Sequence, residues 1–466
     1  MTDRDHHTDP RPDPQMETQV NSWLTHTDLT PVEADAGLDR VLDEFPVTPQ
    51  ARRRYLGRWL DHPPHQNRRN RLMLIATGLT AAFAILALTV NVIDTDTNLP
   101  NQAGTTHVVA ADGSAAFSTI QAAVDAAEPG DTISVLPGTY TEAIVIDKDL
   151  TLTGDGPREE ILIVAPADGP VHPVGFRHMR PSTYALLLIG SNAELHGFTL
   201  AGIDSRLFVD GGAPTVEGLL IEEVGQAYAG AAVTGAVVVK GGGTPTFVEN
   251  ELVGGGGLGA FEDSDPIFER NTLRESGAIG GDFGADAVIR DNVISGAGRE
   301  GITFLGATTA LVSGNTISDK EWGITVGDGI SVDAGADGVP FEPVIEGNSV
   351  SGATQVGINL RSGSPTVTRN TVVDGRTGIT IRLSEATLDS NEVRGNGLGV
   401  LAFDGAPTLV DNSITGNTTG LNVAGGISAT LTGNHVCDNE TNLRITEGSE
   451  VGTEGNDICA DEITAE

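Results

Sequence analysis

The stretch PTVTRNTVVDGRTGITI, from Pro365 to Ile381, returns along the chain as ATLDSNEVRGNGLGVLA (386–402) and PTLVDNSITGNTTGLNV (407–423). Each copy carries an asparagine in the same place. The register of this asparagine covers Asn250, Asn271, Asn292, Asn315, Asn348, Asn370, Asn391, Asn412, Asn434 and Asn456, in steps of 21, 21, 23, 33, 22, 21, 21, 22 and 22 residues. A fixed internal period of this length is typical of an architecture in which one structural unit stacks on the next.

Each repeat follows the pattern Pro-Thr-Val-x-x-Asn-x-Ile, then a turn, then Gly-Ile-x-Val. Side chains in a strand alternate between two faces, so the Asn and the Ile two residues later point the same way. Short strands that recur in one constant order predict coils of a parallel β-helix, in which each strand pairs with its copy about 4.8 Å away. The asparagines then lie at a turn with their amides directed inward, where they hydrogen-bond from coil to coil. We therefore interpret them as structural residues.

The start of the array carries a helix signal. In FSTIQAAVDAAEPGD (117–131), Ser118 lies three residues before Gln121, which is the spacing of a capping box. Ile120, Ala123, Val124 and Ala127 share one helical face. A short amphipathic helix here would cover the open end of the coil stack.

Two groups of motifs resemble known proteins. The opening ADGSAAFSTIQAAVDAAEPGDTISVLPGTYTEAIVIDKDLTLTGDG (111–156) resembles that of pectin methylesterases, and the later Asn-x-Ile/Val coils resemble those of carbohydrate-active and NosD-like proteins. Over roughly residues 107 to 466 the chain thus resembles the pectin lyase-like superfamily. The resemblance implies an all-β, right-handed parallel β-helix with three short strands per coil. The Gln-Asp-Thr and Asp-Phe-Ile-Phe-Gly segments that hold the catalytic residues of pectin methylesterases do not occur here, so that activity is not expected.

Residues 72–93, LMLIATGLTAAFAILALTVNVI, are 22 residues without a charge, long enough to cross a bilayer. Arginines precede this segment and Asp94 and Asp96 follow it, which predicts a single-pass protein of the cell membrane with a cytoplasmic N-terminus. The alternative, a cleaved signal peptide, is disfavoured by the long region before it. The predicted organisation is a partly helical cytoplasmic region (1–71, helices near 31–45 and 49–60), the span, a linker (94–106) and an extracytoplasmic β-helix (107–466).

The formal net charge is −37, and the chain from residue 94 onward carries 52 acidic against 17 basic side chains. Such a surface repels polyanions, so nucleic acid is not an expected partner.

Cys437 and Cys459 each lie three residues after a ladder asparagine, in NHVC and NDIC. Equivalent positions of adjacent coils lie about 4.8 Å apart, which a disulfide accepts. We predict a disulfide in an extracellular compartment, with a pair of reduced, stacked thiols as the alternative.

Outward positions on the Gly-Ile-x-Val strand and its flanks form the first candidate site. The 33-residue step falls here and adds Asp328, Asp333 and Asp337, and insertions in solenoids cluster on the binding face. The candidate ligand-binding residues are Arg299, Glu300, Glu321, Trp322, Arg361, Arg376, Arg382 and Phe403. Asp328, Asp333, Arg361 and Arg382 are also candidates for catalysis.

In this band arginines can hold an anionic sugar, Trp322 can stack on a sugar ring, and Thr303, Asn359 and Thr380 can donate hydrogen bonds. The three aspartates are a weak Ca²⁺ candidate, because their spacing lacks the regularity of a dedicated calcium loop. The competing interpretation is an ordinary acidic outer face with ion pairs between coils.

The second candidate site is VHPVGFRHMRPSTY (171–184), which interrupts the early coils with a cationic cluster. Its members are His172, Arg177, His178, Arg180 and Tyr184. These side chains can bind an anionic sugar or exchange protons with one. A loop that balances local negative charge is the alternative.

These patterns favour a membrane-anchored surface protein that binds polysaccharide or a cell-envelope glycan. Whether it is an enzyme stays open; an enzyme would be a polysaccharide lyase, a glycoside hydrolase or an epimerase. A non-catalytic structural or adhesive module is the alternative. NosD-like metal handling is third, because no cluster of Cys, Met or His suited to a soft metal is visible.

Overall fold

The computed structural model describes residues 104–173, 182–225, 235–282, 285–305, 309–327, 341–446, 448–452 and 454–459. All of them lie in the second of two compact units, Gln102–Glu466. The predicted helices near 31–45 and 49–60 and the predicted span 72–93 lie outside the described residues. Within the described ranges, no helix is both long enough and apolar enough to cross a membrane.

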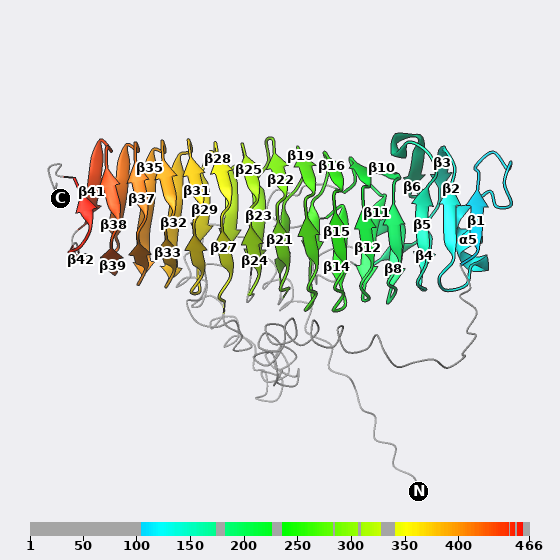
Figure 1. Ribbon diagram of the computed structural model, residues 1–466, viewed down its shortest axis with the longest axis horizontal. Coiled ribbons are helices and arrows are strands. Elements are labelled where there is room, and N and C mark those ends of the chain that lie inside the picture. The colour runs from blue at the N-terminus through cyan, green and yellow to red at the C-terminus, as the bar shows by residue number, and fades with distance from the viewer. Residues whose placement is uncertain are drawn as a thin grey trace, which may run out of the picture. The chain divides into compact units, whose positions relative to one another are not determined.

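Three parallel sheets run along the coil stack, and each strand pairs with its copy in the next coil (Figure 1). Asn370 illustrates the order: β30 (Thr366–Thr368) precedes it, β31 (Thr371–Val373) follows it, and β32 (Thr377–Ser384) completes the coil. β30, β31 and β32 belong to the first, second and third sheet respectively. The predicted all-β parallel β-helix is therefore confirmed.

The first sheet has 15 strands. They are β1 (Thr106–Val109), β2 (Thr132–Val135), β5 (Thr151–Gly154), β9 (Glu194–His196), β12 (Thr215–Glu217), β15 (Thr246–Val248), β18 (Ile267–Glu269), β21 (Val288–Arg290), β24 (Leu311–Ser313), β27 (Val344–Glu346), β30, β33 (Thr387–Asp389), β36 (Thr408–Val410), β39 (Ser428–Thr432) and β42 (Glu450–Gly452).

The second sheet has 14 strands. They are β3 (Gly138–Thr141), β6 (Ile161–Val164), β10 (Thr199–Ala201), β13 (Leu220–Glu222), β16 (Glu251–Val253), β19 (Thr272–Arg274), β22 (Val293–Ser295), β25 (Thr316–Ser318), β28 (Ser349–Ser351), β31, β34 (Glu392–Arg394), β37 (Ser413–Thr415), β40 (His435–Cys437) and β43 (Asp457–Ile458).

The third sheet forms the face on which both candidate sites lie. Its strands are β4 (Ile144–Ile146), β8 (Ser182–Ile189), β11 (Arg206–Asp210), β14 (Val237–Lys240), β17 (Leu258–Ala260), β20 (Ile279–Asp282), β23 (Glu300–Leu305), β26 (Trp322–Val326), β29 (Val356–Leu360), β32, β35 (Leu398–Gly405), β38 (Thr419–Ala424) and β41 (Thr441–Ile445). The short β7 (Val171–His172) pairs antiparallel with β8 at its edge.

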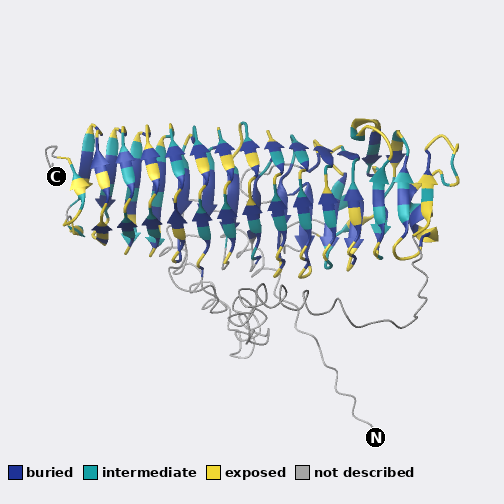
Figure 2. Ribbon diagram, viewed as in Figure 1, coloured by how far each residue is buried: buried dark blue, intermediate teal, exposed yellow. Residues whose placement is uncertain are grey.

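The core is one continuous apolar column inside the coils. Buried residues, dark blue in Figure 2, recur in coil after coil along the stack. Ile379 and Ile381 of β32 are fully buried, as the alternation in the repeat predicts. The glycine at the second position of the third strand has a packing reason. A Cβ built on Gly357 would lie 2.4 Å from a methyl carbon of Val372, so the backbone must pass close to the core here.

The asparagine ladder connects each coil to the next. Asn370 Oδ1 accepts hydrogen bonds from the backbone N–H and the Nδ2 of Asn348, both at 2.9 Å. Its own Nδ2 donates to Asn391 Oδ1 at 3.0 Å and to the backbone oxygen of Ile345 at 2.9 Å. The side chain thus satisfies buried polar groups in neighbouring coils.

A second asparagine ladder, which the sequence analysis did not find, occupies the next turn. Asn396 Nδ2 donates to Asn417 Oδ1 at 3.1 Å, and Asn417 Nδ2 donates to Asn439 Oδ1 at 2.9 Å. Earlier coils have other residues at this turn, including the buried Lys320, whose Nζ donates to Ser276 O at 3.2 Å. This ladder is short, which explains why no period revealed it.

The predicted capping helix is α5 (Ile120–Ala126), and it buries Ile120, Ala123 and Val124 as expected. The predicted capping box is wrong, because the helix begins without a side-chain cap from its own N-terminal residues. Instead, the Glu142 carboxylate accepts the backbone N–H groups of Ile120 and Gln121, both at 2.9 Å. A residue of the next coil therefore satisfies the helix N-terminus. The short η1 (Arg158–Glu160) is the other helical element of the described chain.

Candidate functional site

Both candidate sites lie on the third sheet, where the register aligns equivalent outward positions of successive strands, at or near their C-terminal ends, into a column. Ile189, Asp210 and Lys240 are consecutive members of this column in the early coils. Arg382 and Phe403 are members in the later coils. The inward neighbours in these strands, such as Val209 and Val239, are fully buried. The column therefore lies on the outer side of the sheet.

Four side chains from different strands meet in the early coils and are called the His172 cluster: His172, Tyr184, Asp210 and Lys240. Asp210 is at its centre. Its Oδ2 lies 3.1 Å from His172 Nε2 and 3.0 Å from Lys240 Nζ. The rings of Tyr184 and His172 meet edge to face, with centroids 6.5 Å apart. The carboxylate of Asp210, the imidazole of His172, the ammonium of Lys240 and the phenol of Tyr184 thus lie close together on the outer side of the sheet.

The surroundings of the His172 cluster are apolar. Tyr184 packs with the buried side chains of Phe208, Val238 and Phe261 in a cluster separate from the interior core. Burial and the nearby Lys240 ammonium lower the pKa of His172, although its bond to Asp210 acts in the opposite direction. Burial raises the pKa of Tyr184. At neutral pH the imidazole is therefore neutral and the phenol is protonated.

The tautomer of His172 follows from its partner. A carboxylate only accepts hydrogen bonds, so the neutral ring donates through Nε2 to Asp210. The lone pair then resides on Nδ1. This arrangement matches a general base that a carboxylate orients from behind.

Half of the His172 cluster could be predicted from the sequence. His172 and Tyr184 were candidates, whereas Asp210 and Lys240 were not, and Arg177, His178 and Arg180 lie outside the described residues. A signal was present: VDGG (209–212) and VKGG (239–242) are copies of one repeat position, which places Asp210 opposite Lys240. Following the outward column back to the early coils would have revealed the pair.

The first candidate site centres on a second group, called the Glu300 cluster: Arg299, Glu300, Glu321 and Arg361. The Glu300 side chain is only 16 % exposed, and Arg299 Nε lies 4.0 Å from its Oε1. The pKa of Glu300 is raised, mainly because the carboxyl is removed from water. Arg299 and Arg361 act in the opposite direction, and the negative charge of Glu321 adds to the increase. Glu300 is thus a half-buried carboxyl whose pKa is raised above its ordinary value despite the two nearby arginines.

The remaining predicted residues of this band lie along the same sheet. Trp322 is the register partner of Glu300 and is half-buried rather than exposed. The guanidinium carbon of Arg382 lies 5.9 Å from the ring centroid of Phe403, a cation–π contact. Arg376 Nη1 donates to Gln355 Oε1 at 2.9 Å. The structure therefore divides the predicted set into smaller groups.

The prediction that Thr303 and Asn359 offer accessible hydrogen bonds is wrong. Thr303 is fully buried and Asn359 is 5 % exposed, whereas Thr380 is half-buried. These residues do lie on the outward face, since their neighbours Ile302, Phe304, Ile358 and Leu360 are core residues, but Thr303 and Asn359 have almost no contact with solvent. Asp328, Asp333 and Asp337 lie outside the described residues.

Ion pairs between coils are a regular feature elsewhere on the stack. Arg270 Nε lies 3.0 Å from Glu249 Oε1, and Arg369 Nη2 lies 2.8 Å from Glu346 Oε2. These side chains are largely exposed, so each pair contributes little to stability. They are structural neighbours and not part of either cluster.

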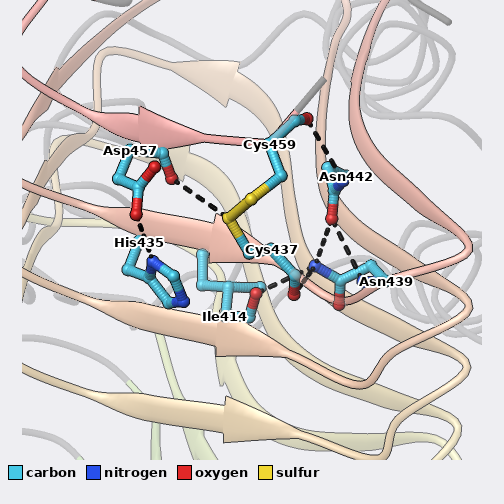
Figure 3. The surroundings of a disulfide bond; sticks show 7 residues. All are labelled: Ile414, His435, Cys437, Asn439, Asn442, Asp457 and Cys459. Carbon is cyan, nitrogen blue, oxygen red and sulfur yellow. Dashed lines mark hydrogen bonds and ion pairs between the residues drawn. A yellow bond between two sulfur atoms is a disulfide. The ribbon is translucent and has the colours of Figure 1, made fainter. Parts of the chain in front are cut away.

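Cys437 and Cys459 form a disulfide with 5.0 Å between their Cα atoms (Figure 3). The Asp457 peptide oxygen lies 3.7 Å from Cys437 Sγ, a contact without a hydrogen because the sulfur is in the disulfide. His435, Cys437 and Asp457 are the one group in the described part of the chain whose ligand atoms converge as in a metal site.

Two family models match the chain. "Right handed beta helix region" matches residues 212–372, and "Periplasmic copper-binding protein (NosD)" matches residues 326–464. Together with the parallel strand topology, these matches confirm the resemblance to right-handed parallel β-helix proteins.

Solved structures with a similar fold include two polysaccharide enzymes. The A-module of the mannuronan C-5 epimerase AlgE6 of Azotobacter vinelandii is 17% identical, with a TM-score of 0.39 over 72% of this chain and 94% of that chain. The catalytic unit of a thermostable GH87 α-1,3-glucanase from Streptomyces thermodiastaticus is 17% identical, with a TM-score of 0.43 over 78% of this chain and 71% of that chain. The search of curated proteins gave no match.

Proposed function

We propose that the β-helix binds an acidic polysaccharide along the outer face of the third sheet and modifies it by proton transfer at the His172 cluster. One observation carries this proposal: Asp210 Oδ2 contacts both His172 Nε2, at 3.1 Å, and Lys240 Nζ, at 3.0 Å. The contact gives the imidazole an orienting carboxylate and brings a cation to the same position. In such an arrangement the imidazole can accept a proton and the ammonium can stabilise the negative charge that develops on the substrate.

The chemistry suits a uronate, whose ring carries a hydrogen on the carbon beside the carboxylate. His172 Nδ1 would remove that proton, and the electron pair would delocalise into the carboxylate next to the Lys240 ammonium. Return of a proton to the opposite face would give epimerisation. Departure of the neighbouring glycosidic oxygen, with a proton from Tyr184, would give a lyase product with a carbon–carbon double bond.

Hydrolysis fits the same residues less well. A glycoside hydrolase of the usual kind needs two carboxyl groups about 5 to 9.5 Å apart, one as acid and one as base or nucleophile. The His172 cluster has a single carboxylate, and Asp210 is occupied by its histidine and lysine partners. We therefore favour a lyase or an epimerase over a hydrolase.

The Glu300 cluster extends the proposed binding surface. It begins on β23, three coils after Lys240 on β14, which corresponds to about 14 Å along the sheet. Arg299 and Arg361 can pair with carboxylates of a bound chain, which the otherwise acidic surface would repel. The bound polysaccharide would thus span both clusters.

A deuterium-exchange experiment tests the proposed chemistry. Acidic and neutral polysaccharides are incubated with the protein in D₂O, with and without Ca²⁺, and examined by NMR for deuterium beside the carboxylate and for unsaturated ends. We expect deuterium in a uronate polymer, and a loss of about 100-fold or more in His172→Ala. His196→Ala is the matched control, because His196 lies on the first sheet between Glu194 and Glu217. Equal exchange by His172→Ala and the unsubstituted protein would contradict the proposal.

The binding surface has its own test. Arg361→Ala should weaken binding of the same polymer about tenfold, since it removes one charged contact. Exchange per bound chain should stay unchanged. Binding that survives this substitution but is lost in Lys240→Ala would confine the ligand to the early coils.

A non-catalytic adhesive module is the second candidate. The regular ion pairs and the continuous ladder favour it, because both serve the stack and need no reaction. If the protein is an adhesive module, it binds a polysaccharide, and no deuterium enters that polysaccharide. The same experiment therefore distinguishes the two functions.

We further propose that residues 72–93 anchor the protein in the cell membrane with the β-helix outside. The uncharged length and the flanking charges support this topology. Protease added to intact cells should digest the β-helix and spare a tag placed before Arg52. The reverse pattern would overturn the topology.

A further inference from the structure

The C-terminal disulfide lies among groups that bind metal ions. His435 and Cys437 lie on β40, and their neighbour Val436 between them is fully buried in the core. The strand alternation therefore turns both side chains to the outside of the coil. In the next coil, Asp457 is the register partner of His435, and Cys459 is bonded to Cys437. Figure 3 shows the four side chains close together; His435, Asp457 and Cys459 are exposed, whereas Cys437 is only 2 % exposed.

The distances are close to those of a metal site. His435 Nδ1 lies 2.8 Å from Asp457 Oδ2, and the ligand atoms of His435, Cys437 and Asp457 all lie within 4.8 Å of one another. Two ligands on one tetrahedral zinc ion are about 3.5 Å apart, given metal–ligand bonds of about 2.0 to 2.3 Å. Rotations of exposed side chains can make up the difference. In the disulfide form, however, the sulfur is unavailable, because only a thiolate is a strong ligand.

We propose that reduction of the Cys437–Cys459 disulfide creates a site for a divalent ion of the zinc class, with His435 Nδ1, an Asp457 oxygen and two thiolates as ligands. Two sulfurs, one imidazole and one carboxylate match the tetrahedral sites that this class of ion prefers. This metal site is independent of the proposed polysaccharide chemistry, and it is closed while the disulfide is intact.

The reduction step needs a dithiol as electron donor. One thiolate of the dithiol attacks the sulfur of Cys459, which is exposed, and the Cys437 sulfur leaves. The second thiol of the donor then releases Cys459 and forms the donor's own disulfide. Two electrons and two protons pass to the protein, and metal binding displaces the two thiol protons.

The fold keeps the thiols in place after the bond opens. Asn439 Nδ2 donates to the backbone oxygen of Cys437 at 2.9 Å, and Asn442 Nδ2 donates to that of Cys459 at 3.2 Å. Both bonds appear beside the disulfide in Figure 3. The backbone ladder between β40 and β43 adds the contact from Cys459 N–H to Val436 O at 3.2 Å. The two cysteines therefore stay in adjacent coils, with Cα atoms that lie 5.0 Å apart in the disulfide form.

Cobalt titration tests the site, because Co²⁺ replaces Zn²⁺ and its thiolate complexes absorb light. The full chain is reduced with a dithiol, desalted without oxygen and titrated with Co²⁺, in parallel with oxidised protein. We expect one equivalent of Co²⁺ with thiolate charge-transfer bands and tetrahedral visible bands in the reduced protein only. Far-ultraviolet circular dichroism checks that reduction leaves the coils folded.

Variants that leave the disulfide intact distinguish a built site from two loose thiols. His435→Ala and Asp457→Asn should each weaken Co²⁺ binding by the reduced protein about tenfold or more. Ser413→Ala is the matched control, since Ser413 occupies the position of His435 one coil earlier and should leave the affinity unchanged. Equal Co²⁺ binding by oxidised and reduced protein would overturn the proposal. So would an affinity that neither His435→Ala nor Asp457→Asn lowers.

Discussion

At the residue scale, the ladder asparagines show why one residue type can recur in every coil for a structural reason, without binding a ligand. Each has a carbonyl and an amide on one short side chain, so it can accept from the coil before and donate to the coil after. Asn391 uses all of this capacity. Its Oδ1 accepts from Asn370 Nδ2 and its Nδ2 donates to Val367 O and Asn412 Oδ1, all within 3.0 Å. An apolar replacement leaves those partners buried and unsatisfied.

Asn391→Ala should therefore lower the free energy of unfolding by about 1 to 3 kcal/mol. Thermal and urea unfolding would measure the change. Asn456→Ala is the internal comparison: Asn456 ends the ladder and is only partly buried, so its loss should cost less. A larger effect at Asn456 than at Asn391 would contradict the structural role.

His172 makes stability depend on pH. An unfolded histidine titrates near pH 6.5, whereas burial and Lys240 hold the pKa of folded His172 below that value. Between the two pKa values the unfolded chain binds more protons, so stability is present above about pH 6.5 and is lost as pH falls through the folded pKa.

His172→Gln should remove this component. The stability difference between the unsubstituted protein and the variant should be larger near pH 7.5 than near pH 5, about one pH unit or more on either side of the unfolded pKa. Melting temperatures across that range would measure it, with His196→Gln as the comparison histidine on another sheet. A difference that grows in acid would mean that the folded pKa is raised instead.

At the element scale, α5 ends the coil stack, whereas the strands continue it from one coil to the next. The helix closes the column at one end by burying Ile120 and Val124, and its first N–H groups depend on Glu142 from the adjoining coil. Helix and first coil are thus coupled through one carboxylate. The coupling explains why the local capping signal at Ser118 was not needed.

Glu142→Ala should destabilise the helix by about 1 kcal/mol, because two N–H groups lose their acceptor. Hydrogen exchange at residues 120–126 should become faster, while exchange in the distant coils should not change. Asp147→Ala removes an exposed acidic residue of the same coil and serves as the control. Unchanged exchange at 120–126 in Glu142→Ala would show that the cap contributes nothing.

At the scale of the whole molecule, charge is the dominant surface property. The formal net charge is −37, and repeated coils bring like charges near one another. Repulsion of this kind favours the unfolded chain and is screened by salt, whose Debye length falls to about 3 Å at 1 M.

The melting temperature should therefore rise with NaCl and level off toward about 1 M. An uncharged osmolyte at matched osmolality separates screening from general solvent effects. A melting temperature that falls with salt would mean that the ion pairs between coils outweigh the net repulsion.

The repeat pattern was enough to predict the fold. Asn370, Asn391 and Asn412 recur at 21 residues, and the alternation around them specifies which side chains turn inward. In a repeat architecture each coil contacts only its neighbours, so local pattern and register are enough to predict strands, core and the pairing of Cys437 with Cys459.

Which chemical groups lie in contact became clear from the three-dimensional arrangement of the coils. Asp210 and Lys240 are 30 residues apart, and their contact depends on where each strand ends. Thr303 faces outward yet is fully buried, a result that alternation does not give. The physical reason is the same in both cases. The period specifies in which direction a side chain points, whereas distance, exposure and pKa depend on what neighbouring coils place around it.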